Sequence, residues 1–88
     1  MRVDVARVAA DGSIRHAALD TADWDDAARW DELVAQADLG SPPPYRPVPQ
    51  QTIYLIHTCG REFAIAEHDL TGPLRELVMA VLAEGEAP

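Results

Sequence analysis

Hydrophobic and polar residues alternate over residues 2–8 near the N-terminus, and residues 13–19 resume a less regular extended pattern. A period of two is the pattern of a half-buried β-strand, and the Asp11-Gly12 dipeptide between the stretches is typical of a tight turn. These residues therefore predict a β-hairpin. The apolar residues of the second stretch do not share one parity, so we expect a β-bulge near His16-Ala17 that brings them to one face.

A helical period follows the first hairpin. Its apolar residues recur three or four positions apart and predict one buried helix face made of Ala27, Trp30, Leu33, Val34 and Ala37. We expect Asp20-Thr21 or Asp23 to cap this helix, because an acidic first turn complements the helix dipole. Residues 38–50 then hold five of the seven prolines. Proline fixes φ and removes a donor, so this segment predicts a stiff, extended crossover.

Two further extended runs, residues 52–58 and 61–67, flank the dipeptide Cys59-Gly60. A two-residue connection sets the register of a hairpin, because the residues on either side of it must pair. The predicted pairs are Thr58 with Arg61, His57 with Glu62, Ile56 with Phe63, and Tyr54 with Ile65. One face of this hairpin should therefore lie in the core, and it consists of Tyr54, Ile56, Phe63 and Ile65.

The opposite face of the second hairpin is unusually apolar for a solvated surface. It carries Ile53, Leu55, His57, Glu62, Ala64 and Ala66. Two interpretations of the aliphatic residues are open. Ile53 and Leu55 belong to a dimer or partner interface, or they lie under the proline-rich segment.

The last element is predicted to be a helix that opens at residues 70–73, with Thr71 or Gly72 as its N-cap and a proline in its first turn. Five apolar residues follow at helical spacing: Leu74, Leu77, Val78, Val81 and Leu82. Gly85 should end the helix. The predicted order ββαββα defines an α+β fold, a four-stranded antiparallel sheet with two helices packed on one face, in a single domain over residues 1–88.

Composition narrows the class of protein. With 88 residues, 48% hydrophobic and 25% charged, the chain is expected to form one globular core. Its 7 basic and 15 acidic residues give a net charge of −8, which repels the phosphates of nucleic acids and anionic lipids, so neither nucleic acid nor membrane is an expected partner. The apolar runs are too short for a signal peptide or a membrane span, which predicts a cytoplasmic protein. Abundant alanine and the use of arginine without lysine indicate a GC-rich bacterial genome.

Residues suited to metal or nucleophilic chemistry are few. The single cysteine, Cys59, lies near His57 and His68 in the sequence, but a mid-strand histidine and a turn cysteine do not converge in tetrahedral geometry. A hairpin turn also offers no pocket in which a histidine could activate the thiol. The three aspartates within residues 23–26 lack the ligand spacing of a calcium loop. We therefore expect no enzyme activity, no metal and no cofactor.

The order and spacing of several short motifs resemble the emfourin family, small protein inhibitors of thermolysin-like zinc metallopeptidases such as protealysin. The resemblance covers nearly the whole chain. In the first half it is carried by Arg7-Val8-Ala9-Ala10-Asp11-Gly12-Ser13-Ile14-Arg15, Leu19-Asp20-Thr21, Ala28-Arg29-Trp30-Asp31-Glu32-Leu33-Val34 and Asp38-Leu39. In the second half it is carried by Pro42-Pro43-Pro44, Thr52-Ile53-Tyr54, Gly60-Arg61 and Leu70-Thr71-Gly72-Pro73-Leu74-Arg75-Glu76-Leu77.

The resemblance implies an inhibitor that occupies the cleft of a thermolysin-like metallopeptidase without being cleaved. A proline-rich segment suits this role, because it is already ordered and bonds to proline are poor substrates for most peptidases. The candidate contacts are Ala9, Ala10, Asp11, Gly12, Leu39, Ser41, Pro42, Pro43, Pro44 and Tyr45. The alternative is a non-catalytic interaction or dimerisation module that uses the second sheet face, through Ile53, Leu55 and His57.

Overall fold

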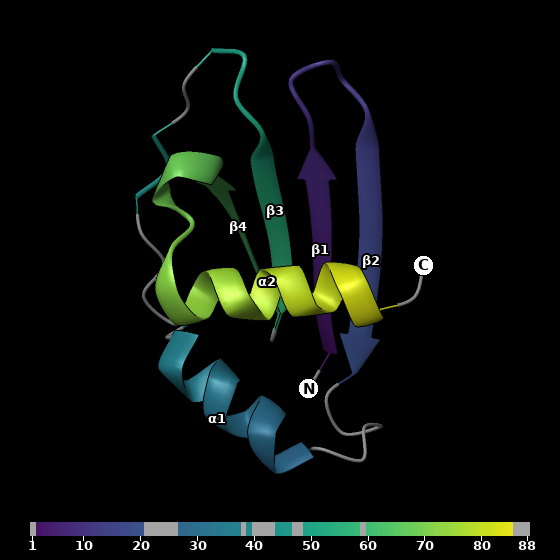
Figure 1. Cartoon of the computed structure of the whole chain (residues 1–88), viewed down its shortest axis with the longest axis vertical. Coiled ribbons are helices and arrows are strands. Elements are labelled where there is room, and N and C mark those ends of the chain that lie inside the picture. Colours follow the sequence, from purple (N-terminus) through teal and green to yellow (C-terminus); the bar gives the residue numbers. More distant parts are fainter. Residues whose placement is uncertain are drawn as a thin grey trace.

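The computed structural model describes residues 2–20, 27–37, 39, 44–46, 49–58 and 60–85. Four strands, β1 (Arg2–Val8), β2 (Ile14–Asp20), β3 (Ile53–Thr58) and β4 (Arg61–Ala66), form one antiparallel sheet in the order β2-β1-β3-β4. Helix α1 (Ala27–Ala37) follows β2. A 3₁₀ turn, η2 (Glu67–Asp69), leads from β4 to α2 (Gly72–Glu84). The element order and the α+β fold class are those predicted (Figure 1).

Both helices lie on the same side of the sheet. Helix α2 crosses in front of the strands and packs on β1 and β2, while α1 packs against α2 near the lower end of the sheet (Figure 1). The apolar stripe predicted for α2 is fully buried, and Trp30 is the buried anchor of α1. One hydrophobic core therefore joins the two ββα halves, with Val3, Val5, Tyr54 and Ile56 at the centre of its sheet side.

The first hairpin differs from the prediction in one respect. Strands β1 and β2 pair without interruption from Arg2–Asp20 to Val8–Ile14, so the predicted bulge near His16-Ala17 is wrong. Ala17 faces the core, whereas the side chain of Ile14 is 67% exposed. The apolar residues of β2 differ in parity because Ile14 remains in solvent, and no bulge is needed to bring it inward.

The second hairpin has the predicted register, with Thr58 opposite Arg61 and the following pairs as expected. Gly60 adopts a φ of 73°, a conformation that glycine tolerates best. Cys59 lies outside the described residues. On the core face Tyr54, Ile56 and Ile65 are buried, but Phe63 is only half-buried because β4 is the edge strand.

The helix ends were predicted only in part. Helix α2 begins after Thr71 as expected, but the Thr71 side chain makes no capping hydrogen bond. Gly85 ends α2 with an ordinary φ of −73°, so its glycine is required by space and not by a left-handed backbone. Trp30 faces the core, while Leu33, Val34 and Ala37 pack against it from partly exposed positions. The predicted cap of α1 at Asp20-Thr21 or Asp23 falls on residues 20–23, of which 21–23 lie outside the described ranges.

Candidate functional site

Two connections that are far apart in the sequence meet at one end of the sheet. Val8, the last residue of β1, pairs with Ile53, the first residue of β3. The turn after β1 (residues 9–13) and the turn before β3 (residues 49–52) must therefore leave the sheet side by side. Figure 1 shows both at the upper end of the strands, away from α1. We call this region the turn end.

Hydrogen bonds within the first turn give it a defined shape. The amide of Gly12 donates to the carbonyl of Ala9 at 3.0 Å, and the amide of Ala9 donates to the carbonyl of Ser13 at 2.9 Å. Oδ1 of Asp11 accepts from the Ser13 hydroxyl at 2.6 Å and from the Ser13 amide at 2.9 Å. These two bonds lower the pKa of Asp11, and the bond from the Ser13 hydroxyl has the larger effect. The turn therefore presents an ionised carboxylate on a fixed backbone.

The second turn carries an unusual backbone conformation. Gln50 has a φ of 63°, and among the residues that the structure describes it is the only non-glycine residue with a positive φ. A side chain in this region costs on the order of 1 kcal/mol and persists only where the surroundings hold it. The amide of Glu67 donates to the carbonyl of Thr52 at 3.0 Å, which ties the end of this turn to η2.

A pocket of about 430 Å³ lies between the two turns. It is an open depression and not an enclosed cavity. Residues from both turns and from the paired strand ends line it: Val8, Ala9, Ala10, Pro49, Gln50, Gln51 and Ile53. The apolar side chains dominate this set, and the two glutamine amides supply its polar groups. Exposed Ile14 lies beside it, opposite Val8 in the sheet.

An ion pair holds the proline-rich segment against the body of the protein. Arg46 donates to Asp69 from Nη2 at 2.5 Å and from Nε at 3.4 Å. The Asp69 side chain is only 8% exposed, so the interaction is partly shielded from water. The hydrogen bond from Arg46 is the main cause of the lowered pKa of Asp69, and the same bond raises the pKa of Arg46.

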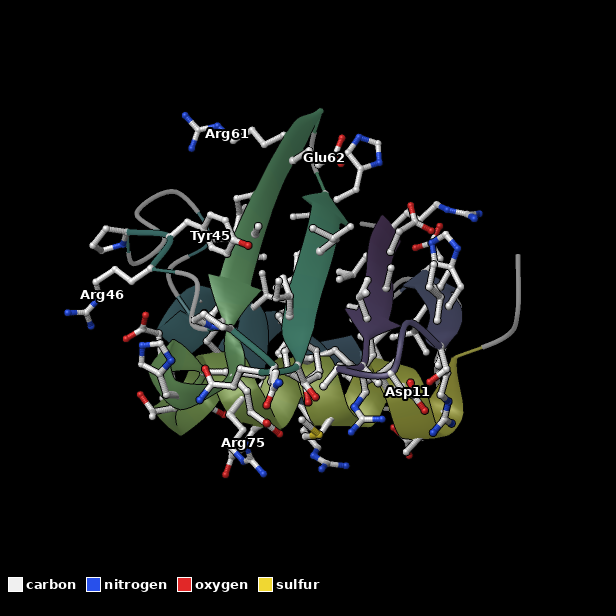
Figure 2. The ribbon with its side chains drawn as sticks, turned by 90° about the horizontal axis from the view of Figure 1, so that it is seen from above. Asp11, Tyr45, Arg46, Arg61, Glu62 and Arg75 are labelled. Atoms are coloured by element: carbon white, nitrogen blue, oxygen red, sulfur yellow. The ribbon has the colours of Figure 1, made fainter. Side chains whose placement is uncertain are left out.

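The neighbouring histidine of η2 extends this contact to the second turn. Nε2 of His68 lies 3.2 Å from Oδ2 of Asp69, and its Nδ1 lies 2.6 Å from Oε1 of Gln51. Residues 46 and 51 are thus both anchored to η2. The side chains of Tyr45 and Arg46 project beside β4 in Figure 2, and Tyr45 is 46% exposed.

The structure separates the predicted contact residues. Ala9, Ala10, Asp11 and Gly12 lie at the turn end, Pro44 is exposed, and Tyr45 projects beside β4. Leu39 is half-buried and packs against the core. Ser41, Pro42 and Pro43 lie outside the described residues.

Four residues of the turn end were missed at the level of sequence: Val8, Ile14, Gln50 and Gln51. Ile14 was expected on the same face as Ala17 and Leu19, through a bulge that the uninterrupted pairing of β1 with β2 excludes. The glutamine pair gave only a weak signal, as polar residues between a proline-rich segment and a strand. Its place in the pocket depends on the pairing of β1 with β3, which no local pattern predicts.

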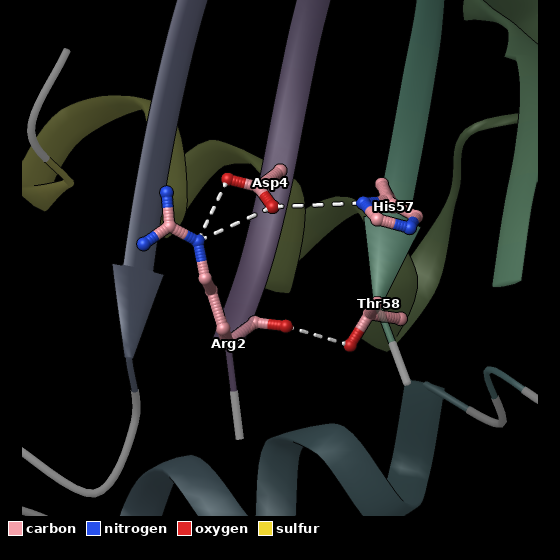
Figure 3. Close-up of polar contacts among 4 residues, drawn as sticks. All are labelled: Arg2, Asp4, His57 and Thr58. Atoms are coloured by element: carbon pink, nitrogen blue, oxygen red, sulfur yellow. Dashed lines mark hydrogen bonds and ion pairs between the residues drawn. The ribbon is translucent and has the colours of Figure 1, made fainter. Parts of the chain in front are cut away.

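The alternative interface is divided between two environments. Ile53 lines the pocket beside Pro49, while Leu55 is 37% exposed on the sheet face that the helices do not cover. His57 lies near the other end of that face. Its Nδ1 is 3.8 Å from Oδ2 of Asp4, whose carboxylate also accepts from Nε of Arg2 at 3.2 Å (Figure 3).

Within the described part of the chain, no three histidine, cysteine or acidic side chains are placed to bind a metal ion. Cys59 and the aspartates at positions 23, 25 and 26 lie outside that part. Neither of the described helices is long and apolar enough to cross a membrane. Comparison with models of protein families, with curated proteins and with solved structures found no match.

Proposed function

We propose that this domain inhibits a thermolysin-like zinc metallopeptidase of the bacterial cytoplasm, and that the turn end enters the peptidase cleft without being cleaved. The observation that carries the proposal is the convergence of two turns around one pocket at an end of the sheet that neither α1 nor α2 covers. The resemblance to the emfourin family supplies the class of target.

The turn end has the physical properties of an inhibitory surface. Its first turn is held by four hydrogen bonds among Ala9, Asp11, Gly12 and Ser13. Its second turn is anchored to η2 through Gln51 and Thr52. A loop that is ordered before binding loses less conformational entropy in the complex. Rigidity also opposes the extended conformation that a peptidase requires of a substrate.

Apolar and acidic groups at the turn end suit complementary parts of a zinc cleft. The exposed side chain of Ile14 and the apolar wall of the pocket offer surface that gains free energy when water is removed from it. The ionised Asp11 and the net charge of −8 attract a cationic cleft and raise the rate of association.

Titration of the protein into a thermolysin-like peptidase from the same genome tests the proposal. Activity should fall in proportion to the protein added and reach a minimum near one inhibitor per active site. Mass spectrometry of the mixture should show an intact inhibitor, and a trypsin-like serine peptidase should keep its activity. Full metallopeptidase activity at micromolar excess of inhibitor, or a cleaved chain, would refute the proposal.

A further inference from the structure

The sheet face away from the helices is a second surface, which shares Val8, Ile14 and Ile53 with the turn end. We call it the open face. The register places its side chains in three rows across β2, β1, β3 and β4. The first row is Ile14, Val8 and Ile53, and it ends at Ala66, which is buried at 1% exposed; the second is His16, Ala6, Leu55 and Ala64; the third is Ala18, Asp4, His57 and Glu62. The first two rows are largely apolar, and the third is charged.

The two central strands of this face are complementary to each other. Along β1 the open face presents Asp4, Ala6 and Val8, and along β3 it presents His57, Leu55 and Ile53. Consider a two-fold axis that runs parallel to the strands, in front of the open face and midway between β1 and β3. This axis would lay β3 of one molecule over β1 of another, with the three rows aligned. A carboxylate would then meet an imidazole, a leucine would meet an alanine, and an isoleucine would meet a valine.

In this arrangement polar groups of one molecule face polar groups of the other, and large side chains face small ones. Asp4 of each molecule faces His57 of the other, so two carboxylate–imidazole contacts form across the axis. Leu55 fills the space above Ala6 of the second copy, which is the large-on-small packing that facing sheets need. The outer strands continue the pattern, with His16 above Ala64. Two facing sheets twist by about 30°, so the central strands keep these contacts best.

We propose that the open face binds a second copy of this chain and forms a symmetric sheet-on-sheet dimer. Six residues at ~3.3 Å along each strand and four strands ~4.8 Å apart give a footprint of roughly 400 Å² per molecule. Stable complexes bury about 800 Å² of accessible surface per partner. The dimer is therefore reversible and concentration-dependent. The axis places the turn ends of both copies at the same end of the assembly.

Sedimentation equilibrium of the full chain over a concentration series tests this dimer. The wild type should change from the monomer mass to twice that mass as the concentration rises. Leu55→Glu buries an unpaired carboxylate in the interface and should weaken dimerisation at least about tenfold. Ala83→Glu adds the same charge at an exposed position of α2 and should dimerise as the wild type does.

Circular dichroism and thermal melts keep the test independent of folding. Leu55 already faces solvent in the monomer, so the Glu variant should retain the wild-type spectrum. A second variant, His57→Ala, removes the imidazole that Asp4 of the other copy meets and should also weaken the dimer. A wild type that stays monomeric at millimolar concentration would overturn the proposal. So would a dimer that persists unchanged in folded Leu55→Glu.

Discussion

At the scale of single residues, position 85 has no room for a side chain, which explains why it is a glycine. A Cβ at this position would lie 2.5 Å from the carbonyl oxygen of Val81 and 2.8 Å from that of Ala18. Both neighbours are backbone atoms, in α2 and β2, and cannot move aside as a flexible side chain can. The end of α2 can approach the edge of the sheet this closely because the residue there has no side chain.

Gly85→Ala is therefore expected to lower the free energy of unfolding by about 1 to 3 kcal/mol, the usual cost of overpacking. Urea denaturation followed by circular dichroism measures the change. Ala83→Ser, at an exposed position on the last turn of the same helix, should cost less than about 0.5 kcal/mol. Equal stability of the two variants would show that α2 does not end against β2.

At the same scale, Arg46 and Asp69 predict a pH dependence. The pKa of Asp69 is lowered in the folded state, mainly by its hydrogen bond with Arg46. The pair therefore contributes stability above the unfolded pKa of about 3.9, and this contribution is lost as the pH falls through the lower folded pKa.

Arg46→Met should be less stable than the wild type at pH 7, and the two should converge as the pH falls below about 4. Urea melts at several pH values measure the difference. Arg29→Met, at an exposed position of α1, serves as the control and should show no comparable convergence. A stability difference for Arg46→Met that is the same at every pH would contradict the assignment.

At the scale of elements, the two hairpins show what local patterns can and cannot predict. The register of β3 with β4 was predictable, because the two-residue connection at Cys59-Gly60 determines which residues pair. Which residues of β2 face the core was not predictable, because Ile14 is as hydrophobic as a core residue but is exposed at the surface. Only the position of α2, which covers the other face, explains why it remains in solvent.

Adjacent residues of β3 test this facing directly. Ile56 is buried and Leu55 is exposed, so Ile56→Ala should cost about 2 to 5 kcal/mol and Leu55→Ala less than about 1 kcal/mol. The first value is a large part of the ~5 to 15 kcal/mol that a small domain has. Chemical denaturation at low protein concentration, where the monomer dominates, gives both values. A larger loss for Leu55 would mean that the register is shifted by one residue.

At the scale of the whole molecule, the strand order explains why only one of the two turns at the turn end could be predicted from the sequence. The first turn was a candidate contact because the resemblance to the emfourin family implied it. Its neighbour at Pro49–Gln51 comes from a segment about 40 positions later and joins it only because β1 pairs with β3. Pairing between strands of different hairpins depends on the packed core, so the pocket is a property of the fold.

The central claim is that the turn end binds and inhibits a thermolysin-like metallopeptidase. The most direct measurement compares the inhibition constants of the wild type, Ala10→Lys and Ala83→Lys against that enzyme. Both alanines are exposed, so both variants should fold, but only Ala10 lies at the pocket. The account predicts inhibition by the wild type and by Ala83→Lys alike, and at least about tenfold weaker inhibition by Ala10→Lys. Equal constants for the two variants, or no inhibition by the wild type, would contradict it.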